Sequence, residues 1–156
     1  MDYPLFMRSI LLLSNLVCLF VAIVCFTIDS DRWHEYLTSI ITLIVTIWGF
    51  IVSCQINQCL LLAFTAASIV DFLVTLANTI FMLVLTVKWK KFCNGDIYFD
   101  DGSDWTCYDL NYKGYWGFVY AEITLLLLSL ISRALSGVSS FFLVKFYFND
   151  VKRDHE

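Results

Sequence analysis

The sequence predicts an all-α membrane protein built as a bundle of four transmembrane helices. Of its 156 residues, 60% are hydrophobic and 15% are charged, whereas soluble domains have about half apolar and about a quarter charged residues. The mean hydropathy is +0.75. A hydrocarbon core about 30 Å thick needs about 20 helical residues, and four apolar segments fit this requirement. We therefore predict a single membrane domain over residues 1–156.

The first span is predicted at residues 5–28, where nearly every residue from Ser9 to Thr27 is apolar. This stretch is longer than the apolar core of a signal peptide, about 7 to 15 residues, and it has no small-residue cleavage site. We interpret it as a retained span. The polar turn that follows is short, so the second helix should run back antiparallel beside the first.

The second and third spans are predicted at residues 37–54 and 60–87, joined by a short uncharged turn. Ala63 and Ala67 lie four residues apart in the third span, a spacing of small side chains that lets another helix approach closely. We expect this face to pack against a helix of the same chain. A dimer contact is the alternative.

An aqueous loop is predicted at residues 88–114, before a fourth span at 115–144. Cys93 and Cys107 lie 14 residues apart in this loop; a disulfide between them would need an oxidising compartment and would contribute about 3 kcal/mol. Two free thiols in a cytosolic loop are the alternative. The Lys and Arg residues near the spans divide evenly between the two sides, so the positive-inside rule selects no orientation. Because of the cysteines, we expect this second loop to be extracellular or lumenal and both termini, including a short charged tail at 149–156, to be cytoplasmic.

Three ionisable residues fall inside the spans: Asp71, Glu122 and Arg133. An unpaired charge there costs at least about 2.5 to 3.5 kcal/mol. The expected depths of Asp71 and Arg133 differ by about 5 Å, so we predict an ion pair that clasps two helices together. Glu122 lies nearer the loop side, where water, Tyr36 or Lys113 could satisfy it. A proton or ion pathway is the alternative, but the spans contain no proline and no inverted repeat.

Motifs for catalysis, metal binding and nucleic-acid binding are missing from the sequence. The two histidines have no neighbouring ligands at metal spacing, and there is no phosphate loop or nucleophile elbow. A net charge of −4 argues against a nucleic-acid partner. We therefore expect no enzymatic activity, no metal and no cofactor. Cys54 and Cys59 flank the turn between the second and third spans, where palmitate could be attached; unmodified thiols are the alternative.

Five segments carry a resemblance to a known family: MRSILLLSNLVCLFVAI, DFLVTLANTIFMLVLTV, FCNGD, WTCYDLNYKGYWGFVY and LSGVSSFF. They resemble the MARVEL domain, in particular the small fungal plasma-membrane proteins of the non-classical export protein 2 family. The resemblance implies a four-helix bundle with both termini in the cytosol and a function in the lateral organisation of the plasma membrane, involving sphingolipid- or sterol-rich domains or trafficking to them. The short acidic loop and Arg133 depart from the family pattern.

We expect a non-enzymatic protein that organises lipid and protein microdomains of the plasma membrane, with an endomembrane as the alternative location. Its expected partners are membrane lipids such as sphingolipid or sterol, other membrane proteins, or further copies of itself. The second hypothesis is a small accessory subunit of a larger complex, such as a lipid synthase, a glycan synthase or a channel. It rests on the intramembrane charges and on a serine at every fourth position of one face of the fourth span: Ser132, Ser136 and Ser140. A small transporter is the third hypothesis.

Overall fold

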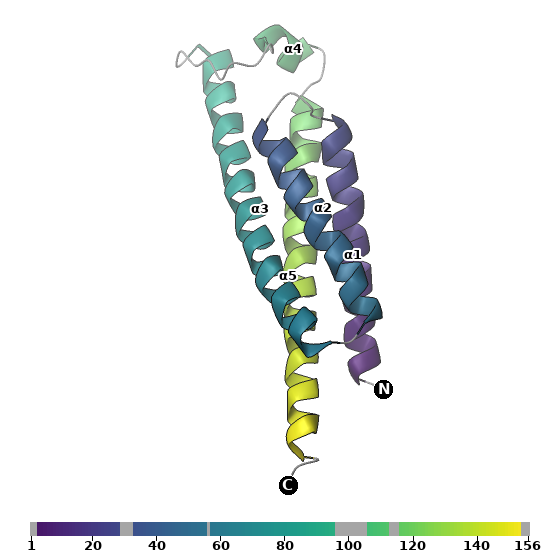
Figure 1. The fold of residues 1–156 in the computed structure, drawn as a ribbon. Coiled ribbons are helices and arrows are strands. Elements are labelled where there is room, and N and C mark those ends of the chain that lie inside the picture. Colours follow the sequence, from purple (N-terminus) through teal and green to yellow (C-terminus); the bar gives the residue numbers. More distant parts are fainter. Residues whose placement is uncertain (1–2, 29–32, 56, 96–105, 113–115, 154–156) are drawn as a thin grey trace.

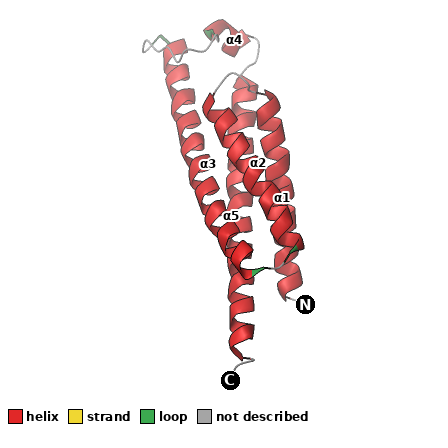
Figure 2. Cartoon of the chain, viewed as in Figure 1, coloured by secondary structure: helices red, strands yellow, loops and turns green. Residues whose placement is uncertain are grey.

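The computed structural model describes residues 3–28, 33–55, 57–95, 106–112 and 116–153, which are all helical apart from short turns. Four helices in these ranges are long and apolar enough to cross a membrane, as the sequence predicts. A fifth, α4, is a short helix that was not expected (Figures 1 and 2). The elements are α1 (Tyr3–Ile28), α2 (Trp33–Cys54), α3 (Gln58–Cys93), α4 (Cys107–Tyr112) and α5 (Trp116–Arg153).

The four long helices form a ring in which α1 packs against α2 and α5, and α3 packs against α2 and α5. Figure 1 shows the start of α1, the α2–α3 turn and the end of α5 at one end of the bundle, which we call the turn end. The short helix α4 lies at the opposite end, which we call the loop end. Towards the turn end, α5 projects beyond the other three helices (Figure 1).

The helix α3 is longer than predicted, because residues 88–93, expected in the aqueous loop, are its last turns. Lys90 and Lys91 lie in the final turn, where cations are favoured by the negative end of the helix dipole. The helix ends at Cys93 with Asn94 as its C-cap. Gly95 follows the cap with a φ of +82°, which suits glycine, and its N–H donates to the Phe92 carbonyl over 2.9 Å. Residues 96–105 and 113–115 of the predicted loop lie outside the described residues.

The other long helices also extend past their predicted bounds. The helix α2 begins at Trp33, four residues before the predicted start, and α5 continues to Arg153, into the predicted charged tail. Residues 154–156 of that tail lie outside the described residues. The Asn57 side chain caps the start of α3, since its Oδ1 accepts from the Cys59 N–H over 2.9 Å, which satisfies one of the free donors at a helix start.

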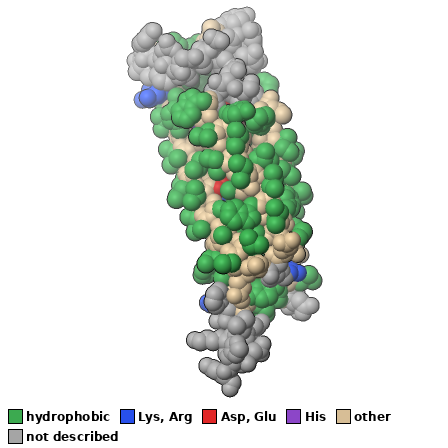
Figure 3. Space-filling model, in the orientation of Figure 1, with side chains coloured by type: hydrophobic (Ala, Val, Ile, Leu, Met, Phe, Trp, Pro, Cys, Tyr) green, Lys and Arg blue, Asp and Glu red, His purple; other side chains and the backbone are tan. Residues whose placement is uncertain are grey.

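The bundle is apolar outside and polar inside. In Figure 3 hydrophobic side chains cover the middle of the visible face, and Lys and Arg side chains appear towards its two ends. The buried positions hold a large share of Ser, Thr and Asn side chains together with Asp71 and Arg133. Small polar residues at helix contacts and apolar residues outside are expected where the solvent is lipid, because apolar burial gives no driving force there.

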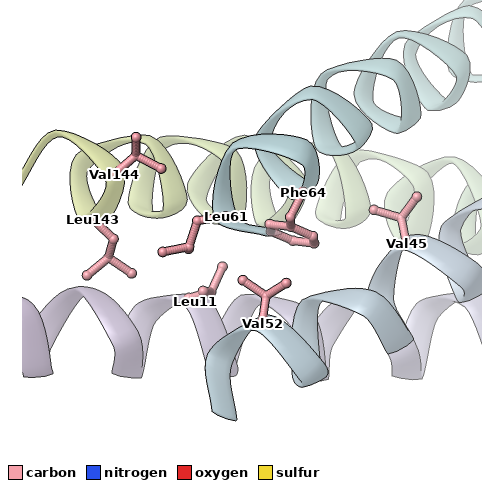
Figure 4. Close-up of a cluster of buried hydrophobic side chains, with 7 residues drawn as sticks. All are labelled: Leu11, Val45, Val52, Leu61, Phe64, Leu143 and Val144. Atoms are coloured by element: carbon pink, nitrogen blue, oxygen red, sulfur yellow. The ribbon is translucent and has the colours of Figure 1, made fainter. Parts of the chain in front are cut away.

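Two apolar clusters lie along the bundle on either side of the buried charges. The turn-end cluster draws on all four long helices, and Figure 4 shows Leu11, Val52 and Leu61 converging between them. The loop-end cluster joins α3 and α5. On α3, Asp71 falls between the two clusters, and on α5 Arg133 does the same. The turn-end cluster is Leu11, Val45, Val52, Leu61, Phe64, Leu143 and Val144, and the loop-end cluster is Met82, Val119, Ile123 and Leu126.

Candidate functional site: an intramembrane polar clasp and the groove beside it

Asp71 of α3 and Arg133 of α5 form a buried ion pair. Arg133 Nε lies 2.6 Å from Asp71 Oδ2, and each residue is only 1% exposed. Neither atom has a hydrogen bond of good geometry, so the contact is a short electrostatic one rather than an aligned N–H···O bond. The structure thus brings together the two residues that the sequence predicts to pair, on helices that pack directly against each other.

The remaining contacts of the guanidinium reach the other two helices. Arg133 Nη1 donates to Asn15 Oδ1 of α1 over 3.2 Å. Nη2 donates to Thr46 Oγ1 over 2.8 Å and to the Thr42 carbonyl over 3.3 Å, both on α2. The Thr42 hydroxyl in turn donates to Asp71 Oδ1 over 2.8 Å. These five residues, which we call the polar clasp, connect all four long helices at one level.

Asn15 is held in place by contacts of its own. Its Nδ2 donates to the Leu11 carbonyl over 2.8 Å and to Ser136 Oγ over 3.3 Å, so its Oδ1 is left to face Arg133. Gly49 of α2 gives it room, because a Cβ atom at Gly49 would lie 2.5 Å from Asn15 Oδ1. The glycine therefore lets α1 and α2 approach closely at the clasp.

Four residues of this site were not predicted from the sequence. They are the clasp residues Asn15, Thr42 and Thr46, and Gly49 beside them. A signal for them exists, since Thr38, Thr42 and Thr46 recur every fourth residue in an otherwise apolar segment. Such a row marks one helix face, and in a membrane the polar face is the one that packs against other helices. Asn15 is the one amide side chain in the predicted first span.

Glu122 does not belong to the clasp. It is buried on α5 at 6% exposure, eleven residues before Arg133, or about 16 Å along the helix axis. Of the partners considered for it, Tyr36 is 42% exposed and Lys113 lies outside the described residues.

The predicted serine face of α5 lies inside the bundle. Ser132, Ser136 and Ser140 are at most 5% exposed, and Ser140 Oγ is 2.8 Å from Thr65 Oγ1 of α3. This face is therefore used for packing within the chain and is not open to a partner helix. The two predicted alanines differ: Ala67 packs beside the turn-end cluster, whereas Ala63 is exposed.

The cysteines fall into two groups. Cys93 and Cys107 form a disulfide with a Cα–Cα distance of 5.3 Å, joining the end of α3 to the start of α4; the cross-link is the one that the sequence predicts. Cys54 and Cys59 are free and exposed on either side of the α2–α3 turn. Palmitoylation of these two thiols stays a prediction. Among the described residues no cluster of His, Cys, Asp or Glu has an arrangement that could hold a metal.

A groove of ≈ 410 Å³ runs between α3 and α5, with Arg133 among its lining residues. Its walls are mainly apolar and aromatic, and several of its residues belong to the exposed outer surface. It therefore opens towards the surroundings of the bundle rather than into the ring of helices. The groove is lined by Thr65, Ser68, Ile69, Phe72, Arg133, Ala134, Gly137, Val138, Phe141 and Phe142.

Fold and site together define a four-helix bundle of the membrane type in which Asp71 and Arg133 pair with each other inside the bundle. Comparisons of the chain with models of protein families, with curated proteins and with solved structures found no match.

Proposed function

We propose that this chain is a non-enzymatic integral membrane protein that organises lipids and proteins laterally in the plasma membrane, in the way that its resemblance to the MARVEL domain implies. The observation that carries this proposal is the closure of the polar clasp. Asp71 and Arg133 contact each other and three further side chains of the bundle, and both are 1% exposed. The charges therefore serve to hold helices together.

A transport function is less well supported by the same geometry. A conducted ion or proton needs a charged group that exchanges with a wetted path, whereas this pair lies between two apolar clusters along α3 and α5. What the bundle offers to its surroundings is an apolar exterior with a groove between two helices. These features suit a protein that works through contacts with lipids.

The proposal includes an orientation with the loop end outside or lumenal and the turn end cytoplasmic. The Cys93–Cys107 disulfide supports it, because disulfides persist in oxidising compartments. A membrane-impermeant maleimide tests it through Cys54 and Cys59, which are free and exposed at the turn end. We expect labelling of intact cells only after permeabilisation, and the Cys54→Ser/Cys59→Ser variant serves as the control. Labelling of intact cells at these thiols would reverse the orientation.

The functional experiment follows the distribution of the fluorescently tagged chain at its native level. We expect patches in the plasma membrane that disperse when sphingolipid synthesis is blocked. The double variant Asp71→Asn/Arg133→Met, which removes both buried charges together, should keep these patches. A uniform internal-membrane distribution that does not respond to lipids would contradict the proposal, and a measurable flux lost in Asp71→Asn with normal expression would favour a transporter.

A second measurement separates an organiser from an accessory subunit. The tagged protein is purified in mild detergent from its native cells, and the mass of the intact complex is determined. We expect this chain alone or as a homo-oligomer, with sphingolipid or sterol attached. One large enzyme or channel at a fixed ratio would instead make the chain a subunit of that complex.

A further inference from the structure

We propose that the groove between α3 and α5 binds one sterol-class lipid, taken up from the bilayer, whose hydroxyl group hydrogen-bonds to Ser68. This inference rests on the proposed function and deepens it by naming a lipid class and its site. Three features of the groove support this assignment: an unsatisfied hydroxyl among its lining residues, a floor whose charges are paired, and a size and lining that suit a small apolar molecule.

Ser68 is the residue that points to a ligand. It lines the groove and is 1% exposed, yet within the described part of the chain its Oγ has no hydrogen-bond partner. A buried hydroxyl without a partner is unfavourable. The other hydroxyl in the groove is occupied, since Thr65 Oγ1 bonds to the Leu61 carbonyl and to Ser140 Oγ. Ser68 Oγ is itself covered in the structure, so the side chain has to turn towards the groove before a ligand can reach it. One small polar group of a ligand, able to donate or accept, would then satisfy Ser68.

The charge of the floor excludes a charged headgroup. Arg133 lines the groove, but Asp71 neutralises it at 2.6 Å, and Asn15, Thr42 and Thr46 accept its other contacts. An anionic phosphate would gain little there and would lose its hydration in a buried, apolar setting. The ligand that fits is therefore neutral, with one hydrogen-bonding group.

The walls and the size of the groove complete the description. Phe72, Phe141 and Phe142 supply aromatic surface, and Ile69 and Val138 supply aliphatic surface. A volume of ≈ 410 Å³ falls in the range of sites for single small molecules, about 300 to 1,000 Å³, which are also mostly apolar with a few placed polar groups. A rigid apolar body with a single hydroxyl, as in a sterol, matches this combination.

The test uses the full-length protein in phosphatidylcholine nanodiscs and a photoreactive sterol that carries an alkyne tag. We expect saturable labelling that excess unmodified sterol removes, with adducts on the α3 and α5 peptides that contain Phe72 and Phe141. Ser68→Ala should lower the affinity for the sterol between about two- and tenfold, the range for one neutral hydrogen bond. The matched control Ser139→Ala, another buried serine outside the groove, should leave it unchanged.

Two further comparisons keep the test decisive. Gly137→Phe should abolish labelling, because a Cβ there already lies 3.6 Å from Ser68 Cβ and a ring beyond it would fill the groove; Ile131→Phe, on the exposed face of α5, is its control. On the original protein, a competitor with the sterol skeleton but no hydroxyl should bind more weakly than sterol, by the same factor that Ser68→Ala costs sterol binding. On Ser68→Ala the two competitors should bind equally.

The proposal is overturned by labelling that does not saturate, by labelling that Ser68→Ala leaves unchanged, or by equal competition from a phospholipid or sphingolipid. A partner helix that copurifies and blocks labelling would overturn it as well. If the binding test fails while the protein still forms patches in cells that do not depend on sterol, the sterol site is refuted and the proposed function stands. If binding is saturable and depends on Ser68 but the protein is spread uniformly over internal membranes, the sterol site stands and the proposed function is refuted.

Discussion

Removing one member of the buried ion pair should destabilise the bundle far more than removing both. Arg133→Met leaves the Asp71 carboxylate with the Thr42 hydroxyl as its one remaining clasp contact. Asp71→Asn leaves the Arg133 charge without a counter-ion at 1% exposure. Loss of one partner of a buried pair costs about 3 to 5 kcal/mol, because the other charge stays buried and uncompensated.

The double variant Asp71→Asn/Arg133→Met buries no charge. It loses the three bonds from Arg133 to Asn15, to Thr46 and to the Thr42 carbonyl, and interhelical hydrogen bonds in membranes are worth about 0.6 kcal/mol each on average. We therefore expect a cost of about 1 to 2 kcal/mol for the double variant. The sum of the two single costs should exceed the cost of the double variant by a coupling energy of at least about 4 kcal/mol in a double-mutant cycle.

Reversible unfolding by sodium dodecyl sulfate in mixed micelles measures these free energies. The intrinsic fluorescence of the five tryptophans follows the transition, with the disulfide kept oxidised in every variant. If the cost of the double variant equals the sum of the two single costs to within about 0.5 kcal/mol, the two residues act independently. The clasp would then not hold the helices together, and the reasoning from its geometry would be refuted.

Two more predictions concern packing and the cross-link. Gly49→Ala should destabilise the bundle by about 1 to 3 kcal/mol in the same unfolding measurement, because the added Cβ would lie 2.5 Å from Asn15 Oδ1; Gly117→Ala, with nothing within 4 Å, is the matched control. Cys93→Ser/Cys107→Ser should lower stability by about 3 kcal/mol through the opened loop, and mild reduction should have no further effect on this variant. A reduction effect of equal size in the variant would contradict that account.

The fold could be predicted from the sequence to the level of its four long helices, because the length of an apolar segment follows from the thickness of a bilayer. The exact ends of the helices could not be predicted, since they depend on local caps and on contact with water. Residues 88–93 are rich in lysine, a composition that favours a loop, yet long amphipathic side chains extend a helix into the interface readily. The short helix α4 has only six residues, too few for a periodic pattern to identify.

Asp71 and Arg133 could be paired from the sequence because intramembrane charges are few and each needs a partner. The rest of the clasp is made of neutral residues whose role depends on helix rotation, which span lengths do not reveal. The same limit applies to the serines on α5, because a regular row marks a helix face and only the packing shows what that face meets. A rule that turns rows of Ser and Thr, and single Asn side chains, inward would place Asn15, Thr46 and Ser136 correctly.

The clasp also sets an order of events during synthesis. Asp71 enters the membrane on the third span, whereas Arg133 follows 62 residues later in the sequence. At a translation rate of about 5 to 20 residues per second, the carboxylate waits about 3 to 12 s for its counter-ion. During that interval the nascent chain has three spans and contains Asp71 without Arg133, its counter-ion. The last helix therefore completes the protein electrostatically as well as sterically, and a chain halted before it should be retained by the insertion machinery and degraded.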